Sequence, residues 1–241
     1  MSRSVTRAVI VAAGLGRRLG QTKQGRPKPL LRVGNRTLLE RSVDLLQQAG
    51  VAEILVVTGW GAAQIEDTLG DRATYALNPF YACTNNMASL WFARAFASGA
   101  PFVYLHADLI YHPQVLDRCL QADGPALALD PHPCGEEEMK VIGREELLVR
   151  GGKELPLEST TGEWIGMARF DAATSAALFD AIEAHLRDEQ AYQAYDMLAF
   201  NTLTARGHRL RLVDCAGLPW VEIDFPQDLQ RARRLFAQGG R

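Results

Sequence analysis

The chain has 241 residues, 47% of them hydrophobic, so it is long enough to bury a substantial core within one α/β domain. Its formal net charge of -2 argues against a general nucleic-acid binder or a membrane-surface protein, because such proteins usually carry a basic excess. No apolar run reaches the length of a membrane span, and the first such run, AVIVAA, continues directly into a glycine-rich loop, so we expect no targeting segment.

Apolar strand-like runs alternate with helical patterns through the first half of the chain. Strands are predicted at residues 8–13, 53–59, 73–77, 102–109 and 126–130, and helices at residues 37–48, around 62–69, at 86–97 and from Pro113 onward. Thr37 and Glu40 form a capping box, and Gly50 is a suitable stop for the helix that they open. This alternation predicts right-handed crossovers and a mostly parallel sheet covered by helices.

After Asp130 the pattern changes to shorter strands. The segments MKVIG, ELLVRGGKEL and EWIGMARF, with a turn at Gly151 and Gly152, predict an antiparallel excursion that forms a lid or a second wall. Helices at about 172–189 and 195–205, strands at 210–214 and 220–224 and a helix from Pro226 complete the chain. Without a repeat or an interdomain linker, the sequence predicts a single-domain α/β fold, a Rossmann-like three-layer sandwich with a mixed, mostly parallel central sheet.

The first strand runs into the basic loop GLGRRLGQTKQGRPKPL. No Asp or Glu occurs between residues 1 and 39, the Walker A pattern is absent, and Leu19 stands where a dinucleotide fingerprint has its third glycine. Glycines and prolines keep the loop irregular until about Thr37. We expect it to fold round a triphosphate, with amides from Gly14 to Arg17 on phosphate oxygens and with Arg18 and Lys28 as counter-charges. The alternative is a tight turn with solvated arginines.

The residues VAAGLGRRL followed by RPK resemble the signature of sugar-phosphate-type nucleotidyltransferases, AAGxGxRL and then PK. Within that family, the resemblance is strongest to the group of CTP:phosphocholine cytidylyltransferases and their relatives that act on 2-aminoethylphosphonate. The resemblance implies the nucleotidyltransferase fold, a nucleoside triphosphate in the loop, and Arg18 and Lys28 as catalytic residues that stabilise the reacting phosphates. The sugar enzymes usually read RLxPxT, whereas Gly20, Gln21 and Thr22 follow Leu19 here, which counts against a hexose phosphate.

The resemblance also indicates where the nucleotide lies. The segment NNMASL is similar to one in the cytidylyltransferases and implies that Asn85 and Asn86 lie beside the nucleotide, although either one could equally cap the helix that follows. Backbone near the first strand and the turn at Gly59 are candidates for contacts with the base. The predicted nucleotide-binding residues are therefore Ala12, Ala13, Gly14, Leu15, Gly16, Arg17, Gly59, Asn85 and Asn86.

Two aspartates at strand ends predict a Mg2+ site. Asp108 ends the apolar strand VYLHAD, at the sheet edge where α/β proteins bind ligands, and Asp224 follows the strand WVEID. Asp224 is also well placed to cap the last helix. HADL and EIDFPQDL match the metal-binding aspartate and the C-terminal element of the cytidylyltransferase group. His106 shares a strand face with Asp108, and we expect it to pack beside the site and orient it.

The second half of the chain offers residues for an acceptor substrate. Lys140, in a segment that matches the group's EMKV, is predicted to hold the acceptor's phosphate or phosphonate, or alternatively to pair with the preceding glutamates. Aromatic and acidic side chains would suit an ammonium group at the acceptor's other end, although core packing is the competing role of the tryptophans. These candidates are Glu163, Trp164, Tyr195, Asp196 and Trp220.

Together these features predict a Mg2+-dependent cytidylyltransferase that transfers CMP from CTP to a small phosphate- or phosphonate-bearing amine. Residues 1–241 form the nucleotidyltransferase domain, with a nucleotide-binding half at about 1–130 and an acceptor-binding half at about 131–241. The alternatives are an enzyme for a sugar or inositol phosphate and a nucleotide-binding module without turnover; an NAD-type oxidoreductase is opposed by Leu19 and by Asn35 and Arg36, where an acidic residue is needed. Four separated cysteines without a CxxC pair fit reduced thiols in the cytoplasm, and the exposed faces of the second-half helices leave a homodimer open.

Overall fold

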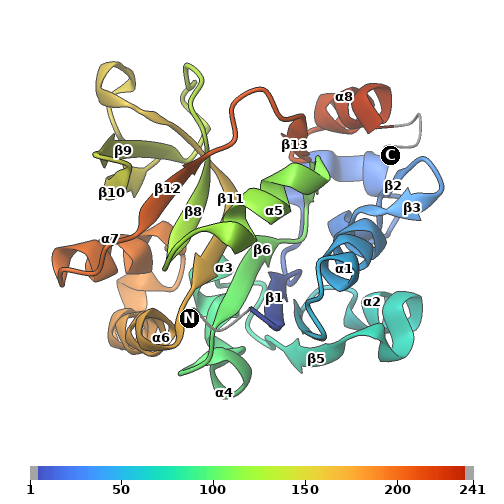
Figure 1. Ribbon diagram of the computed structural model, residues 1–241. Helices are drawn as coiled ribbons and strands as arrows, with labels where there is room; N and C mark the ends of the chain where they lie inside the picture. Colours follow the sequence, from blue (N-terminus) through green and yellow to red (C-terminus); the bar gives the residue numbers. More distant parts are fainter. Residues whose placement is uncertain (1–4, 237–241) are drawn as a thin grey trace.

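The computed structural model describes residues 5–236, and a nine-stranded sheet runs through them (Figure 1). Its first four strands are parallel: β5 (Thr74–Leu77), β4 (Glu53–Thr58), β1 (Arg7–Val11) and β6 (Phe102–His106). The sheet continues with β11 (Gly162–Phe170), β8 (Ala126–Asp130), β12 (Arg211–Asp214), β10 (Leu147–Gly152) and β9 (Lys140–Arg144). Strands β10 and β11 run against the others, so the predicted mixed sheet is confirmed.

Helices cover both faces of the sheet. One layer consists of α1 (Leu38–Gln48), α2 (Ala62–Leu69) and α5 (Pro113–Gln121), and the other of α3 (Asn86–Trp91), α4 (Arg94–Ala97), α6 (Ala172–Leu186) and α7 (Met197–Ala205). The last helix, α8 (Pro226–Phe236), packs on the hairpin β2 (Arg32–Val33) and β3 (Arg36–Thr37). This is the three-layer α/β sandwich that the alternating pattern predicts.

The central strands are apolar because both of their faces are buried. In β1, Val9 belongs to the hydrophobic cluster on the α6–α7 side, whereas Ala8 and Ile10 belong to the cluster on the α1–α5 side. All three side chains have no exposed surface. Such continuous apolar runs are typical of parallel strands between two helix layers.

The second half of the chain inserts into the middle of the sheet. Strand β11 lies antiparallel between β6 and β8, and β9 and β10 form an antiparallel hairpin at the edge, which confirms the predicted excursion. The predicted turn at Gly151 and Gly152 is wrong: both glycines lie within β10, opposite Val141 and Lys140. The chain reverses instead at Glu145 and Glu146, which adopt positive φ angles of 52° and 59°.

Two further predicted elements are shorter than expected. The helix at 86–97 is divided into α3 and α4, because the amides of Phe92 and Ala93 bond to carbonyls three residues back and tighten the turn there. The strand at 102–109 ends at His106, and the chain then forms β7 (Leu109–Tyr111), which pairs with β13 (Trp220–Glu222). Asp108 therefore lies in the turn between two strands.

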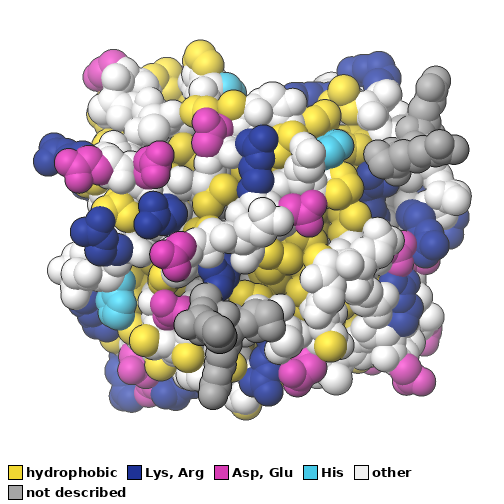
Figure 2. Space-filling view, in the orientation of Figure 1, with side chains coloured by type: hydrophobic (Ala, Val, Ile, Leu, Met, Phe, Trp, Pro, Cys, Tyr) yellow, Lys and Arg dark blue, Asp and Glu magenta, His cyan; other side chains and the backbone are white. Residues whose placement is uncertain are grey.

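The surface carries mixed charge on the face in Figure 2, where basic and acidic side chains are interspersed and do not gather into one basic patch. Among residues 5–236, no helix has both the length and the apolar character needed to cross a bilayer.

Gly59, directly after β4, packs closely against the start of the glycine loop. A Cβ at this position would lie 2.6 Å from the carbonyl oxygen of Ala13 and 2.7 Å from Cβ of Tyr81. We expect Gly59→Ala to destabilise the protein by about 1–3 kcal/mol, because backbone must move to make room. Thermal unfolding followed by circular dichroism measures the effect. The matched control is Gly14→Ala, whose Cβ meets no heavy atom within 4 Å; equal melting temperatures for the two variants would contradict the prediction.

Candidate active site

The glycine loop leaves the sheet at the carboxyl end of β1. Ala12 and Ala13 are buried, and the Ala12 amide donates to the carbonyl of Val57 at 2.8 Å. The residues from Gly14 to Arg18 then line a cavity of about 380 Å³. Gly16 has a positive φ of 55°, and a Cβ there would lie 3.2 Å from Cβ of Lys28. The glycine thus lets the two ends of the loop approach each other.

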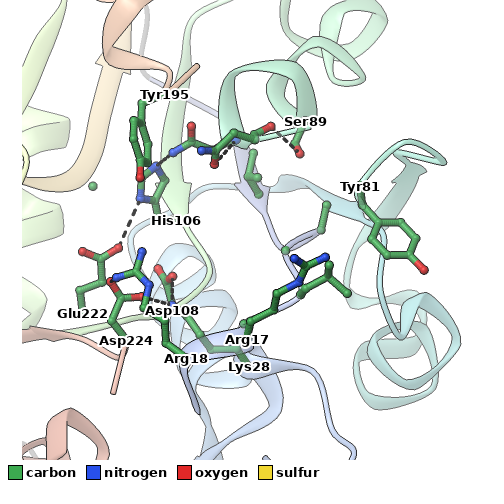
Figure 3. A pocket seen from close by; sticks show the side chains of 18 of the residues that line it. Arg17, Arg18, Lys28, Tyr81, Ser89, His106, Asp108, Tyr195, Glu222 and Asp224 are labelled. Carbon is green, nitrogen blue, oxygen red and sulfur yellow. Dashed lines mark hydrogen bonds and ion pairs between the residues drawn. The ribbon is translucent and has the colours of Figure 1, made fainter. Parts of the chain in front are cut away.

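Lys28 is the central cation of the site. Its ammonium lies 2.6 Å from Oδ2 of Asp108 and 2.7 Å from Oδ1 of Asp224, while the Arg18 guanidinium lies 2.9 Å from Oδ2 of Asp224. Figure 3 shows these side chains converging from the loop, from the turn after β6 and from the segment after β13. Four of the predicted residues therefore meet at one point.

These charges shift the titration of their neighbours. Burial opposes ionisation of Lys28, but the carboxylates of Asp108 and Asp224 outweigh it and raise the pKa of Lys28. Burial likewise opposes ionisation of Asp108, and the Lys28 ammonium lowers the pKa of Asp108 despite it. Burial, followed by the charge of Asp108, raises the pKa of Glu222 to about 7. Asp108, Asp224 and Glu222 thus lie close enough together for their charges to affect one another.

Three residues of the cluster have the spacing of a metal site. Single ligand atoms of His106, Asp108 and Glu222 all lie within 4.8 Å of one another. Among the described residues, Oδ1 of Asp108 has no hydrogen-bond partner although it is buried. A buried carboxylate oxygen without a partner and a second carboxylate within ligand distance of it both fit a divalent cation, which prefers oxygen ligands. Glu222 was not among the predicted metal ligands, although it lies two residues before Asp224.

His106 is tied to the opposite wall. Its Nε2 lies 2.8 Å from Oδ2 of Asp196 and 3.2 Å from Nδ2 of Asn86, and its Nδ1 lies 4.0 Å from Oε1 of Glu222. Burial lowers the pKa of His106, but the Asp196 carboxylate outweighs this and raises it to about 9. His106 thus presents one ring nitrogen to the carboxylates and is oriented through the other.

The predicted nucleotide side is assembled around the N-terminus of α3. Asn85 and Asn86 both line the cavity, together with Tyr81, Thr84 and Ser89, which the sequence analysis did not identify. The Asn85 side chain caps α3 by accepting from the Asn86 amide, and Oδ1 of the Asn86 side chain accepts from the Asp196 amide at 3.0 Å. Ala13 also lines the cavity, whereas Ala12 and Gly59 lie behind the loop and are not among the described residues that line it.

The other end of the cavity contains two of the residues predicted to bind the acceptor, Trp164 and Tyr195. Trp164 is 3% exposed and lies edge-on to His106, with ring centroids 5.0 Å apart. Tyr195 is 36% exposed. Four more residues from separate segments also line the cavity, and sequence reasoning missed them because no local pattern marks them: Glu137, Met139, Lys153 and Gln193.

The remaining predicted acceptor residues are not among the described residues that line the cavity. The Lys140 ammonium is buried and donates to the carbonyls of Gly135 and Glu136 at 3.1 and 3.0 Å. Asp196 is fully buried, and its carboxylate accepts from Tyr104, from the Met197 amide and shares a hydrogen bond with His106. These two side chains hold the site's walls in place.

Glu163 and Trp220 lie beyond the cavity. The Trp220 indole donates to Oδ2 of Asp130 at 2.8 Å. Glu163 is 7% exposed, and its Oε2 lies 3.4 Å from Nε2 of His132. Burial, followed by the charge of Glu138, raises the pKa of Glu163 to about 8.

The sequence is similar to those of known proteins. Residues 8–205 match the family described as the MobA-like NTP transferase domain. The chain is 30% identical over 253 residues to a CMP-5'-(3-aminopropyl)phosphonate synthase from Streptomyces rubellomurinus, covering 96% of this chain and 39% of that protein. It is 31% identical over 240 residues to a bifunctional IPC transferase and DIPP synthase from Rubrobacter xylanophilus, covering 95% of this chain and 51% of that protein. The chain thus spans about two fifths of the length of the first relative and about half of the length of the second.

Solved structures share the fold. A putative glucose-1-phosphate thymidylyltransferase from Bacillus anthracis superposes with a TM-score of 0.83 at 19% identity, over 98% of this chain and 96% of the other. A CTP:phosphocholine cytidylyltransferase from Streptococcus pneumoniae superposes with a TM-score of 0.79 at 20% identity, over 95% of this chain and 98% of the other. Both agree with the expected nucleotidyltransferase fold.

The raised pKa of Glu163 predicts a pH-dependent stability. The folded state holds a proton that the unfolded chain releases near pH 4.5, so stability falls as pH rises from about 4.5 to 8. We expect Glu163→Gln to leave the free energy of unfolding unchanged at about pH 4 and to raise it by about 1–3 kcal/mol at about pH 8. Urea unfolding at the two pH values measures this.

The control for that experiment is Glu158→Gln, on the exposed 3-10 turn Leu157–Ser159. It should change stability at neither pH. A Glu163→Gln variant with the same pH dependence as the wild type would contradict the prediction. The groups nearest to Glu163 that set the balance are Glu138, Glu222, Asp130, His132 and Lys153.

Proposed function

The chain belongs to the MobA-like NTP transferase family, and from this premise we propose that it is a CTP-dependent cytidylyltransferase. It transfers CMP to a small amine that carries a phosphate or phosphonate, and it releases pyrophosphate. The observation that carries the proposal is that one cavity joins the glycine loop, with Lys28 between Asp108 and Asp224, to a second end lined by Trp164 and Tyr195.

The name of the Streptomyces relative supports the choice of substrates. That protein is called a CMP-aminopropylphosphonate synthase, and its product joins CMP to an aminoalkyl phosphonate. In this chain the aromatic end of the cavity suits a cationic head, and the basic loop suits the phosphates. The absence of a proline-threonine pair after Leu19 agrees with an acceptor other than a hexose phosphate.

In the proposed reaction, an acceptor oxygen attacks the α-phosphorus of CTP in line with the departing pyrophosphate. A phosphate or phosphonate oxygen is already anionic near pH 7, so no side chain has to remove a proton. Residues from Gly14 to Arg17 line the cavity, and their amides would hold phosphate oxygens. Lys28 and Arg18 would stabilise the charge that develops on the leaving pyrophosphate.

The carboxylates would hold Mg2+. Asp108, Glu222 and Asp224 are the residues available for it, and a bound divalent cation would neutralise the charge of the triphosphate. Lys28 holds Asp108 and Asp224 together, and His106 orients the cluster from behind through Asp196. The protein's own contribution is therefore positioning and charge stabilisation. The separated cysteines favour a cytoplasmic setting for this reaction.

Pyrophosphate release tests the proposal directly. Each nucleoside triphosphate is assayed with Mg2+ against phosphocholine, 2-aminoethylphosphonate, phosphoethanolamine, inositol phosphate and hexose 1-phosphates. We expect release with CTP and at least one phosphorylated or phosphonylated amine. Release only with a sugar or inositol phosphate would support the alternative acceptor class, and no release with any pair would indicate a binding module.

Neutralising either aspartate tests the proposed metal site. We expect Asp108→Asn and Asp224→Asn each to reduce kcat at least about 100-fold, because a metal ligand and a partner of Lys28 are lost together. Circular dichroism should show an intact fold. The control is Asp180→Asn on α6, whose side chain is 65% exposed and pairs with Arg94 at 3.5 Å. Near-normal rates in either aspartate variant would refute the assignment.

A further inference from the structure

The second end of the cavity already contains a cation. The Lys153 ammonium lies 3.7 Å from Oε2 of Glu137 and 5.2 Å from the centroid of the Tyr195 ring. All three side chains line the cavity, and the Lys153 side chain is 27% exposed. A carboxylate on one side and an aromatic face on the other are the two contacts that a protein offers an ammonium ligand.

The three residues come from separate segments that the fold brings together. Glu137 lies in the loop between β8 and β9, Lys153 directly follows β10, and Tyr195 lies just before α7. In Figure 3, Tyr195 and Glu222 lie on one side of the cavity, and Arg17 and Tyr81 on the other. Lys153, whose ammonium lies 5.2 Å from the centroid of the Tyr195 ring, therefore lines the cavity beside Tyr195.

We propose that Glu137 and Tyr195 form a binding position for the ammonium group of the acceptor. In the free protein the Lys153 ammonium fills this position, and the acceptor displaces it. The inference rests on the proposed function and extends it. An acceptor with its phosphonate toward Lys28 places its own ammonium where the Lys153 ammonium now lies. The enzyme thereby selects acceptors that carry an anionic group at one end and a cation at the other.

The contacts of Lys153 are suited to exchange. The Glu137 side chain is 76% exposed, and exposed ion pairs contribute little free energy. The lysine side chain is long and flexible, so its ammonium can move into solvent while its backbone stays in place. An acceptor whose tail is neutral leaves the pair intact and gains no contact with Glu137.

The loop that carries Glu137 is anchored independently of Lys153. Lys140, 1% exposed, donates from its ammonium to the carbonyls of Gly135 and Glu136, immediately before Glu137. The backbone that carries Glu137 therefore keeps its place when Lys153 moves away. Lys140 acts on the acceptor as a positioning residue, through the loop.

Paired acceptors test the inference. KM and kcat with CTP and Mg2+ are measured for 2-aminoethylphosphonate and for ethylphosphonate, which lacks only the amine. The variants are Glu137→Gln and Lys153→Met, and the control is Glu136→Gln, in the same loop but with an exposed side chain outside the cavity lining. The wild type should prefer the aminoalkyl compound.

Glu137→Gln should raise KM for 2-aminoethylphosphonate by about two- to fivefold and leave KM for ethylphosphonate unchanged. Lys153→Met should lower KM for 2-aminoethylphosphonate by about two- to fivefold, because the competing ammonium is gone. In Glu136→Gln both constants should match the wild type.

Three results distinguish a failure of the proposed function from a failure of the proposed ammonium position. If the wild type releases no pyrophosphate with CTP and any amine, the proposed function fails. If the wild type uses 2-aminoethylphosphonate but Glu137→Gln behaves like Glu136→Gln, the ammonium position is wrong and the function stands. If Lys153→Met raises KM for both phosphonates equally, Lys153 binds the phosphonate and the proposed displacement is overturned.

Discussion

The site depends on one ammonium group placed between two carboxylates. Lys28 comes from the N-terminal loop, Asp108 from the turn after β6, and Asp224 from the segment before α8, so this contact joins the beginning, middle and end of the chain. Without a cation there, two carboxylates would repel each other in a half-buried position. Lys28 therefore stabilises the fold and the reaction centre through the same atoms.

Under the proposed function, the cavity beside this contact serves two substrates at two ends. The N-terminus of α3 and the glycine loop form one end, and Trp164, Tyr195 and the loop containing Glu137 form the other. Asn86, His106 and Asp196 are hydrogen-bonded to one another behind the carboxylates. Asp196 also caps α7, directly after Tyr195, so the wall beside the nucleotide end is physically connected to the aromatic end.

Local patterns predicted the fold well wherever elements depend on near neighbours. The capping box at Thr37 and Glu40 starts α1 as expected, and the apolar runs of the first half form the parallel strands. The position of β11 between β6 and β8 could not be predicted, because long-range pairing leaves no local periodicity. Within the candidate site, Arg18, Lys28, Asp108 and Asp224 meet as expected, since glycines and strand ends mark them. Burial of Asp196 and Glu163 depends on tertiary packing and was not visible in the sequence.

The pairing of β7 with β13 limits which insertions the segments around the carboxylates can accept. Leu109 pairs with Glu222, and the Ile223 amide donates to the Asp108 carbonyl at 3.0 Å, so both acidic segments are locked in one register. An insertion in either strand would shift Glu222 and Asp224 away from Asp108. The loop between β8 and β9 is less constrained: Met139 at its end accepts from the Trp164 amide of β11, whereas residues 131–138 belong to no strand. Under the proposed function, acceptor preference can therefore diverge through this loop while the carboxylates keep their register.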